Sequence, residues 1–80
     1  MARLKVAHAP IATGGIPDEG RLVYADDALV AVLVRLDADL AAQMGGSWYL
    51  EAAFGRVDDF HHPVFETVED CLAWIERRLA

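Results

Sequence analysis

Residues 21–36, RLVYADDALVAVLVRL, decide the fold of this chain. Residues 21–25 are rich in strand formers, and Asp26-Asp27 supplies a polar turn, although it lacks the glycine that a type I′ turn prefers. Residues 28–36 are apolar on both faces as far as Arg35, whereas a strand with one solvated face alternates apolar and polar residues. The pattern predicts a β-hairpin whose second strand is covered on both faces, by the rest of the chain or by a partner subunit.

A further strand is predicted at residues 47–54, where apolar and polar residues alternate. Trp48 and Phe54 fall on its more apolar face and are expected to pack under a helix. The ten residues 37–46 link this strand to the hairpin. Asp37 or Asp39 is suited to cap a short helical turn there, and the glycines at 45–46 are suited to end it.

The strongest helix signal lies at residues 67–80. Thr67 is a suitable N-cap, and Asp70 stands three residues later, in a relative of the capping box. Acidic residues open the segment and arginines close it, as the helix dipole favours. The apolar residues recur at helical spacing and form one stripe: Val68, Cys71, Leu72, Ile75 and Leu79.

The first twenty residues differ from the rest, because glycines and prolines interrupt them every few positions. Residues 1–20 therefore form an N-terminal arm or loop, with room for a short edge strand near its start, and residues 21–80 form a single α+β domain. The expected fold is a small antiparallel sheet of three strands, or four with the arm, and one C-terminal helix packed on one face.

Composition narrows the function classes. The chain has 80 residues, 7 Lys+Arg against 13 Asp+Glu, and a net charge of −6, which argues against binding to nucleic acid or to anionic lipid. With 55% hydrophobic residues it is not a disordered acidic tail. No apolar run approaches the length of a membrane span, and a single cysteine allows no intrachain disulfide, so a cytoplasmic location is expected.

The apolar second strand suggests an interaction surface. A domain of this size buries too little surface to be robust alone, and a partner subunit is a common remedy. Leu29 and Leu33 share one face in a regular strand, and Tyr24 and Tyr49 are expected beside them. These four residues are the predicted contact surface of a homodimer, with a different protein as the other partner that the surface would suit.

A second hypothesis concerns the loop at residues 58–66. His61, His62, Asp59 and Glu66 are residue types that bind small ligands or divalent metals. Adjacent histidines in an extended segment point to opposite sides, however, so the two are poorly placed to bind one ion. A polar loop that leads the chain into the helix is the competing interpretation.

No catalytic constellation stands out, so whether the protein is an enzyme stays open, and no catalytic residue or cofactor is predicted. Cys71 falls on the apolar stripe of the helix, where a thiol packs in the core rather than acting as a nucleophile. The leading hypothesis is therefore a non-enzymatic homodimeric interaction module, with a ligand- or metal-binding domain as the alternative.

Overall fold

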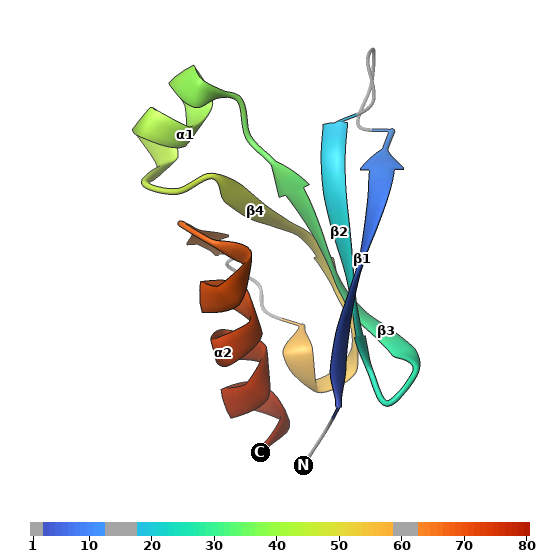
Figure 1. Cartoon of the computed structure of the whole chain (residues 1–80). Helices are drawn as coiled ribbons and strands as arrows, with labels where there is room; N and C mark the ends of the chain where they lie inside the picture. The colour runs from blue at the N-terminus through green and yellow to red at the C-terminus, as the bar shows by residue number, and fades with distance from the viewer. Residues whose placement is uncertain (1–2, 13–17, 59–62) are drawn as a thin grey trace.

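The computed structural model describes residues 3–12, 18–58 and 63–80. These residues form a five-stranded antiparallel sheet in the order β1-β2-β3-β4-β5, so each strand pairs with its neighbours along the chain. The elements shown in Figure 1 are β1 (Leu4–Ile11), β2 (Asp18–Ala25), β3 (Ala28–Arg35), α1 (Ala38–Met44), β4 (Trp48–Ala53), the 3₁₀ turn η1 (Gly55–Val57), β5 (Val64–Phe65) and α2 (Val68–Leu79). The α+β class is confirmed, but the expected three or four strands and single helix are corrected to five strands and two α-helices among the described residues.

β1 is an eight-residue edge strand within the segment expected to be an arm. It pairs with β2 without interruption, from Leu4 opposite Ala25 to Ile11 opposite Asp18. The pairing explains how a segment that contains Pro10 stays extended, because an edge strand tolerates a missing donor on its open side. Residues 4–11 are therefore extended because β2 offers them hydrogen-bond partners, and not because of a strand signal in their own sequence alone.

The β2–β3 turn is formed by Asp26 and Asp27, as the sequence predicts. Both residues have positive φ, 50° and 70°. A two-residue hairpin turn of type I′ demands this geometry, because it matches the twist of the strands. The Oδ1 atom of Asp26 accepts a hydrogen bond of 2.9 Å from the Arg3 amide, and this bond ties the start of β1 to the turn.

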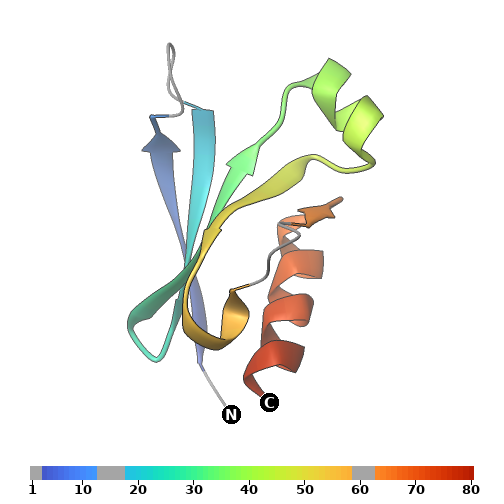
Figure 2. The ribbon, with the colours of Figure 1, turned by 180° about the vertical axis from the view of Figure 1, so that it is seen from behind.

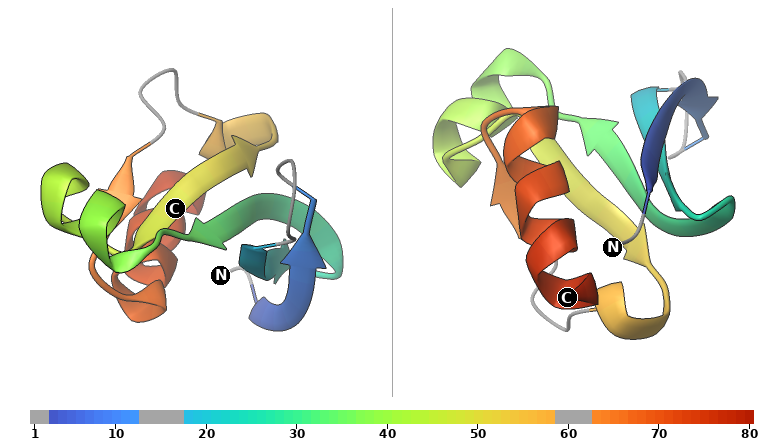
Figure 3. Two further views of the ribbon diagram at one scale, coloured as in Figure 1. Left: turned by 90° about the horizontal axis from the view of Figure 1, so that it is seen from above. Right: turned by 60° about the horizontal axis from the view of Figure 1, so that its bottom comes forward.

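The sheet has one covered face, and α2 lies against it (Figure 1). Seen from above, the sheet is curved and α2 lies on its concave side (Figure 3). The core between them contains fully buried Leu33 and Leu50 from the sheet and Cys71 and Ile75 from α2. Phe65 closes one side of this core through an edge-on contact with Trp74, with ring centres 5.5 Å apart.

Both helices begin at a capping residue, and α1 also ends at one. The Asp37 side chain, rather than that of Asp39, accepts from the Leu40 amide at the start of α1, and Gly45 ends that helix at a positive φ of 81°. The Oγ1 atom of Thr67 accepts from the Asp70 amide at 3.0 Å, which confirms the predicted cap of α2. α1 has no buried residue and lies beyond the ends of β3 and β4 instead of covering the sheet (Figure 1).

Candidate interaction surface

The second face of the sheet is what we call the open face. The register defines it, because directly opposed residues share a face and successive residues alternate between faces. Val23 is fully buried in the core, so its neighbours along β2 point to the other side. Cross-strand pairing extends this set to Lys5, Ala7, Ala9, Gly20, Leu22, Tyr24, Leu29, Val32, Val34, Tyr49, Ala52 and Val64.

The open face is apolar and only partly shielded. Lys5 is the one charged residue in the set just given, and Asp18 follows on the same side of the sheet, two positions before Gly20. Gly20 is buried and Val34 is 4% exposed, whereas the other apolar members are half-buried. Figure 1 and Figure 2 show α2 on one side of the sheet and α1 beyond the ends of β3 and β4, so neither of these helices covers the open face as α2 covers the opposite one.

The structure separates the four residues predicted as the interaction surface. Tyr24, Leu29 and Tyr49 lie on the open face and are half-buried. Leu33 lies on the covered face, where it is fully buried and belongs to the core. Its assignment to an exposed surface is therefore corrected, while the interaction role of the other three stays a prediction.

A β-bulge in β3 explains this difference. Tyr24 pairs with Leu29, but Val23 pairs with Ala31, so Val30 is an extra residue in the ladder. One extra residue moves every residue before it to the opposite face relative to a regular strand. Leu29 and Leu33 therefore point to opposite sides, although four residues separate them.

A second bulge has the same effect in β4. Leu33 pairs with Leu50 and Val32 pairs with Ala52, which leaves Glu51 as the extra, exposed residue. Ala52 therefore faces away from Leu50, contrary to the regular alternation expected at residues 47–54. Phe54 follows this strand and is 48% exposed, so the prediction that it packs under the helix is wrong.

The open face also contains Val32, which regular alternation along β3 puts on the face away from Leu29. Leu22, Val32 and Ala52 form its central row, in direct cross-strand register. The alternating apolar pattern of β3 placed Val32 opposite Leu29, and the pattern carries no mark of the bulge. The only signal available was the hairpin itself, since a two-residue turn pairs Ala25 with Ala28 and hence Tyr24 with Leu29.

The loop at residues 58–66 gives the second hypothesis little support. Asp59, His61 and His62 lie outside the described residues, and Glu66 is exposed. Within residues 3–12, 18–58 and 63–80, no group of three or more His, Cys, Asp and Glu side chains is placed to bind a metal.

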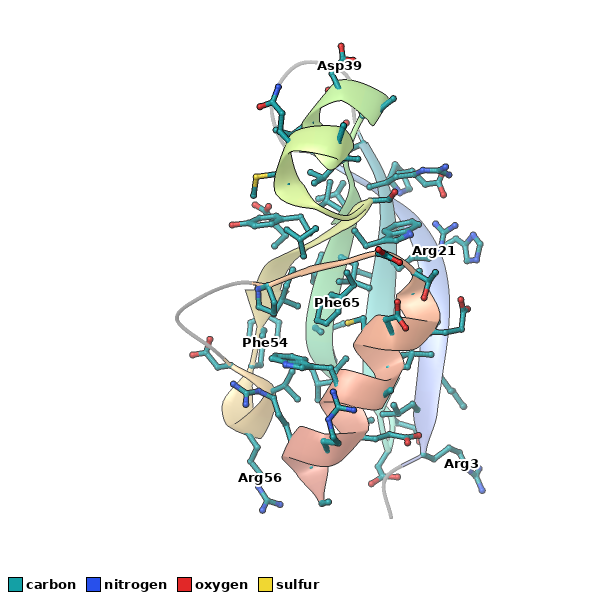
Figure 4. All side chains as sticks on the ribbon, turned by 90° about the vertical axis from the view of Figure 1, so that its left-hand side faces the viewer. Arg3, Arg21, Asp39, Phe54, Arg56 and Phe65 are labelled. Carbon is teal, nitrogen blue, oxygen red and sulfur yellow. The ribbon has the colours of Figure 1, made fainter. Side chains whose placement is uncertain are left out.

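Glu66 nevertheless lines a hollow of about 480 Å³ between β1, β2 and the start of α2, together with His8 and Arg21. Arg21 already has partners there: its guanidinium contacts a Glu19 carboxylate oxygen at 2.7 Å and lies 4.8 Å from the Trp48 ring centre (Figure 4 labels Arg21). The lining of the hollow is a mixture of polar and apolar side chains, and the guanidinium of Arg21 is engaged in contacts within the protein.

The surroundings of Cys71 prevent its thiol from acting as a nucleophile. Its side chain is fully buried between α2 and the sheet. Burial raises the pKa of the thiol from 9.0 to about 12, because the low-dielectric core disfavours the thiolate. Since the thiolate is the reactive form, Cys71 acts as a packing residue.

Comparisons with protein-family models, with curated proteins and with solved structures give no match. No helix among the described residues is long and apolar enough to cross a membrane.

Proposed function

We propose that this protein is a non-enzymatic interaction module that acts as a homodimer through the open face. The observation that carries the proposal is the contrast between the two faces of one sheet. The covered face packs against α2, whereas the open face presents an equally apolar surface without a described cover. Contiguous apolar patches of this kind mark protein contact sites more often than free surface.

The size of the open face is adequate for a modest dimer. Four long strands about 4.8 Å apart, of up to eight residues at about 3.3 Å each, give a face of roughly 19 Å by 26 Å. Two such faces bury on the order of 1,000 Å² together, which is about the lower limit for a specific interface. A second copy also meets the need of a small domain for additional buried surface.

The edges of the sheet are less suited to a partner than the open face. Arg3 and Asp26 exchange hydrogen bonds, so Arg3 and every second residue after it turn their backbone groups toward β2. His8 and Pro10 then turn theirs toward the free edge, where Pro10 has no amide hydrogen to donate. At the other edge β5 has two residues and follows Pro63. Proline and short strands are features that discourage edge-to-edge pairing.

We expect the module to act in the cytoplasm, where an unpaired thiol such as Cys71 is ordinary. The acidic composition favours a protein partner over nucleic acid or an anionic membrane. A second copy is the partner we propose, because the same apolar surface is present on both molecules and is therefore complementary to itself.

The test is a matched pair of leucine substitutions. Leu22→Lys places a charge in the central row of the open face, and Leu40→Lys makes the same change on α1, where Leu40 is 40% exposed. Sedimentation equilibrium should show a dimer for the natural protein and Leu40→Lys, and a monomer or a dimer weakened at least tenfold for Leu22→Lys. Circular dichroism must show that Leu22→Lys remains folded.

A folded Leu22→Lys variant with the dimer affinity of Leu40→Lys would remove the open face as the contact. If Leu22→Lys does not fold, Tyr49→Lys at the edge of the same face replaces it. Leu33→Asp is not a useful variant, because Leu33 is fully buried and a charge there disrupts the core whatever the oligomeric state.

A further inference from the structure

Charge is distributed unevenly along the molecule. Near the middle of the molecule lie the carboxylates of Glu51, Glu69 and Asp70, since α2 begins at mid-length (Figure 1), and toward the α1 end lie those of Asp18, Glu19, Asp37, Asp39 and Glu66. The described cations there are Arg21 and Arg35, and both contact Glu19. Figure 4 shows Asp39 at this end and Arg3 and Arg56 at the opposite one.

The opposite end, where the two termini lie, is close to neutral. Its five described cations are Arg3, Lys5, Arg56, Arg77 and Arg78, and its four described carboxylates are Asp26, Asp27, Asp58 and Glu76. The described residues thus leave a surplus of about three negative charges at the α1 end, about three near the middle and about one positive charge at the terminal end. The negative charge of the molecule therefore lies away from the terminal end.

The charged residues on the open face follow the same distribution along the molecule. Lys5 lies in its last row at the terminal end, opposite Tyr24, and its side chain is 62% exposed. Asp18 pairs with Ile11 beyond the last row at the α1 end, on the same side of the sheet as Ala9 and Gly20. The two rows lie six residue positions apart along β1, a distance of about 20 Å.

We infer that the two copies pack open face to open face with their long axes antiparallel, so that Lys5 of each copy faces the partner's Asp18. This inference rests on the proposed homodimer. A twofold axis that joins two open faces must lie in the plane between them, and in the aligned packing of two sheets it runs close to the strand direction or across it. An axis along the strands would place the two acidic ends together, whereas an axis across them places each acidic end over a near-neutral one.

The geometry of sheet packing agrees with the antiparallel arrangement. The rows of Lys5 and Asp18 are each three residue positions from His8 of β1, so an axis across the strands at His8 exchanges them. Stacked sheets lie about 10 Å apart, a gap that a lysine and an aspartate side chain together can span. Lys5 has a long contact of 3.5 Å with Asp27, whose side chain is 86% exposed, so little holds it within its own copy.

A charge-exchange cycle tests the orientation. Lys5→Asp and Asp18→Lys each replace an attraction by a repulsion at two symmetric positions, and the double variant restores opposite charges with the natural net charge. Each single change should weaken the dimer about tenfold at low salt, and the double variant should recover the natural affinity to within about twofold. The differences should shrink in 0.5 M NaCl, because exposed charges are screened there.

Glu76→Lys on α2 is the control, since it changes the net charge as Asp18→Lys does but lies on the opposite side of the sheet. A natural protein that is monomeric in sedimentation equilibrium would overturn the homodimer and the orientation together. A dimer in which the effects of Lys5→Asp and Asp18→Lys simply add would overturn the orientation and leave the homodimer standing. Recovery in the double variant, with no effect of Glu76→Lys, supports both.

Discussion

The Asp26-Asp27 turn provides a direct test of how this chain forms its hairpin. Both aspartates hold positive φ, a region that disfavours residues with a side chain and favours glycine. Asp26 has a second role, because its carboxylate accepts the Arg3 amide hydrogen, whereas Asp27 makes only the 3.5 Å contact with Lys5. Asp27→Gly therefore relieves backbone strain at the turn position whose side chain makes the weaker contact.

The expected magnitude follows from three opposing terms. Removing the side chain at φ 70° gains about 1 kcal/mol, near the low end for a left-handed residue because aspartate tolerates this region. The greater freedom of glycine in the unfolded chain takes back about 0.5 kcal/mol. The Lys5–Asp27 contact is highly exposed and contributes little. Asp27→Gly should thus stabilise the protein by about 0.5 kcal/mol, or raise Tm by about 3 °C for a domain of this size.

Asp27→Ala separates backbone strain from the loss of the carboxylate. Alanine also lacks the contact with Lys5, but it keeps a Cβ in the left-handed region and lacks the local hydrogen bonds that help aspartate there. We expect Tm to fall by about 6 °C, so the two variants should differ by about 9 °C. Thermal unfolding followed by circular dichroism, at one protein concentration and with the oligomeric state recorded, measures the difference. An Asp27→Ala variant as stable as Asp27→Gly would show that φ at this position carries no strain.

Two further predictions concern the core. Leu33→Ala should destabilise the fold by about 2–5 kcal/mol and Leu29→Ala by less than about 1.5 kcal/mol, because of the two only Leu33 is fully buried. Urea unfolding of the two variants measures the difference. Equal losses of unfolding free energy would contradict the assignment of the two leucines to opposite faces. The pKa of Cys71 is about 12 in the folded chain and about 9.0 in the unfolded chain, so the folded chain binds this proton more tightly. The protonated thiol therefore stabilises the fold fully below pH 9, and this contribution is lost as the pH rises toward 12. Urea unfolding between pH 8 and pH 11 should show a smaller decline in Cys71→Ala than in the natural protein, and parallel declines would contradict it.

The sequence was most informative where local signals and burial agree. The cap at Thr67 and the buried residues Cys71 and Ile75 both follow from the pattern of residues 67–80, and α2 forms there. The hairpin around Asp26-Asp27 was also predicted correctly, because strand formers flank a short polar turn. In these segments, the residues that determine the local structure also determine the packing.

The sequence was least informative where structure depends on a distant partner. β1 has weak strand signals of its own and is extended because β2 offers it a complete ladder. β5 has two residues and pairs with β4 only once the chain has turned through η1. These two strands are stabilised by hydrogen bonds to neighbouring strands. The sequence pattern of a single segment does not contain that information.

The candidate surface was partly predictable for a related reason. Tyr24, Leu29 and Tyr49 were correctly grouped on one side of the sheet, but Leu33 was added to them because β3 was assumed to be regular. A bulge can usually be suspected where apolar and polar residues change phase. β3 is apolar on both faces, so the phase change at Val30 leaves no trace in the sequence.

The apolar character on both sides of β3 therefore has two separate physical roles. The residues after the bulge, such as Leu33, pack against α2 and stabilise the single chain. Val32 and Leu29 contribute no packing against α2 from the open face, and leaving them in water forgoes about 25 cal/mol for each Å² of apolar area that a partner would cover. Pro10 at one edge and the brevity of β5 at the other discourage growth of the sheet in its own plane. The proposed association through the open face would bury the apolar surface without extending the sheet, and a twofold contact that uses the same face on each copy would end at two copies.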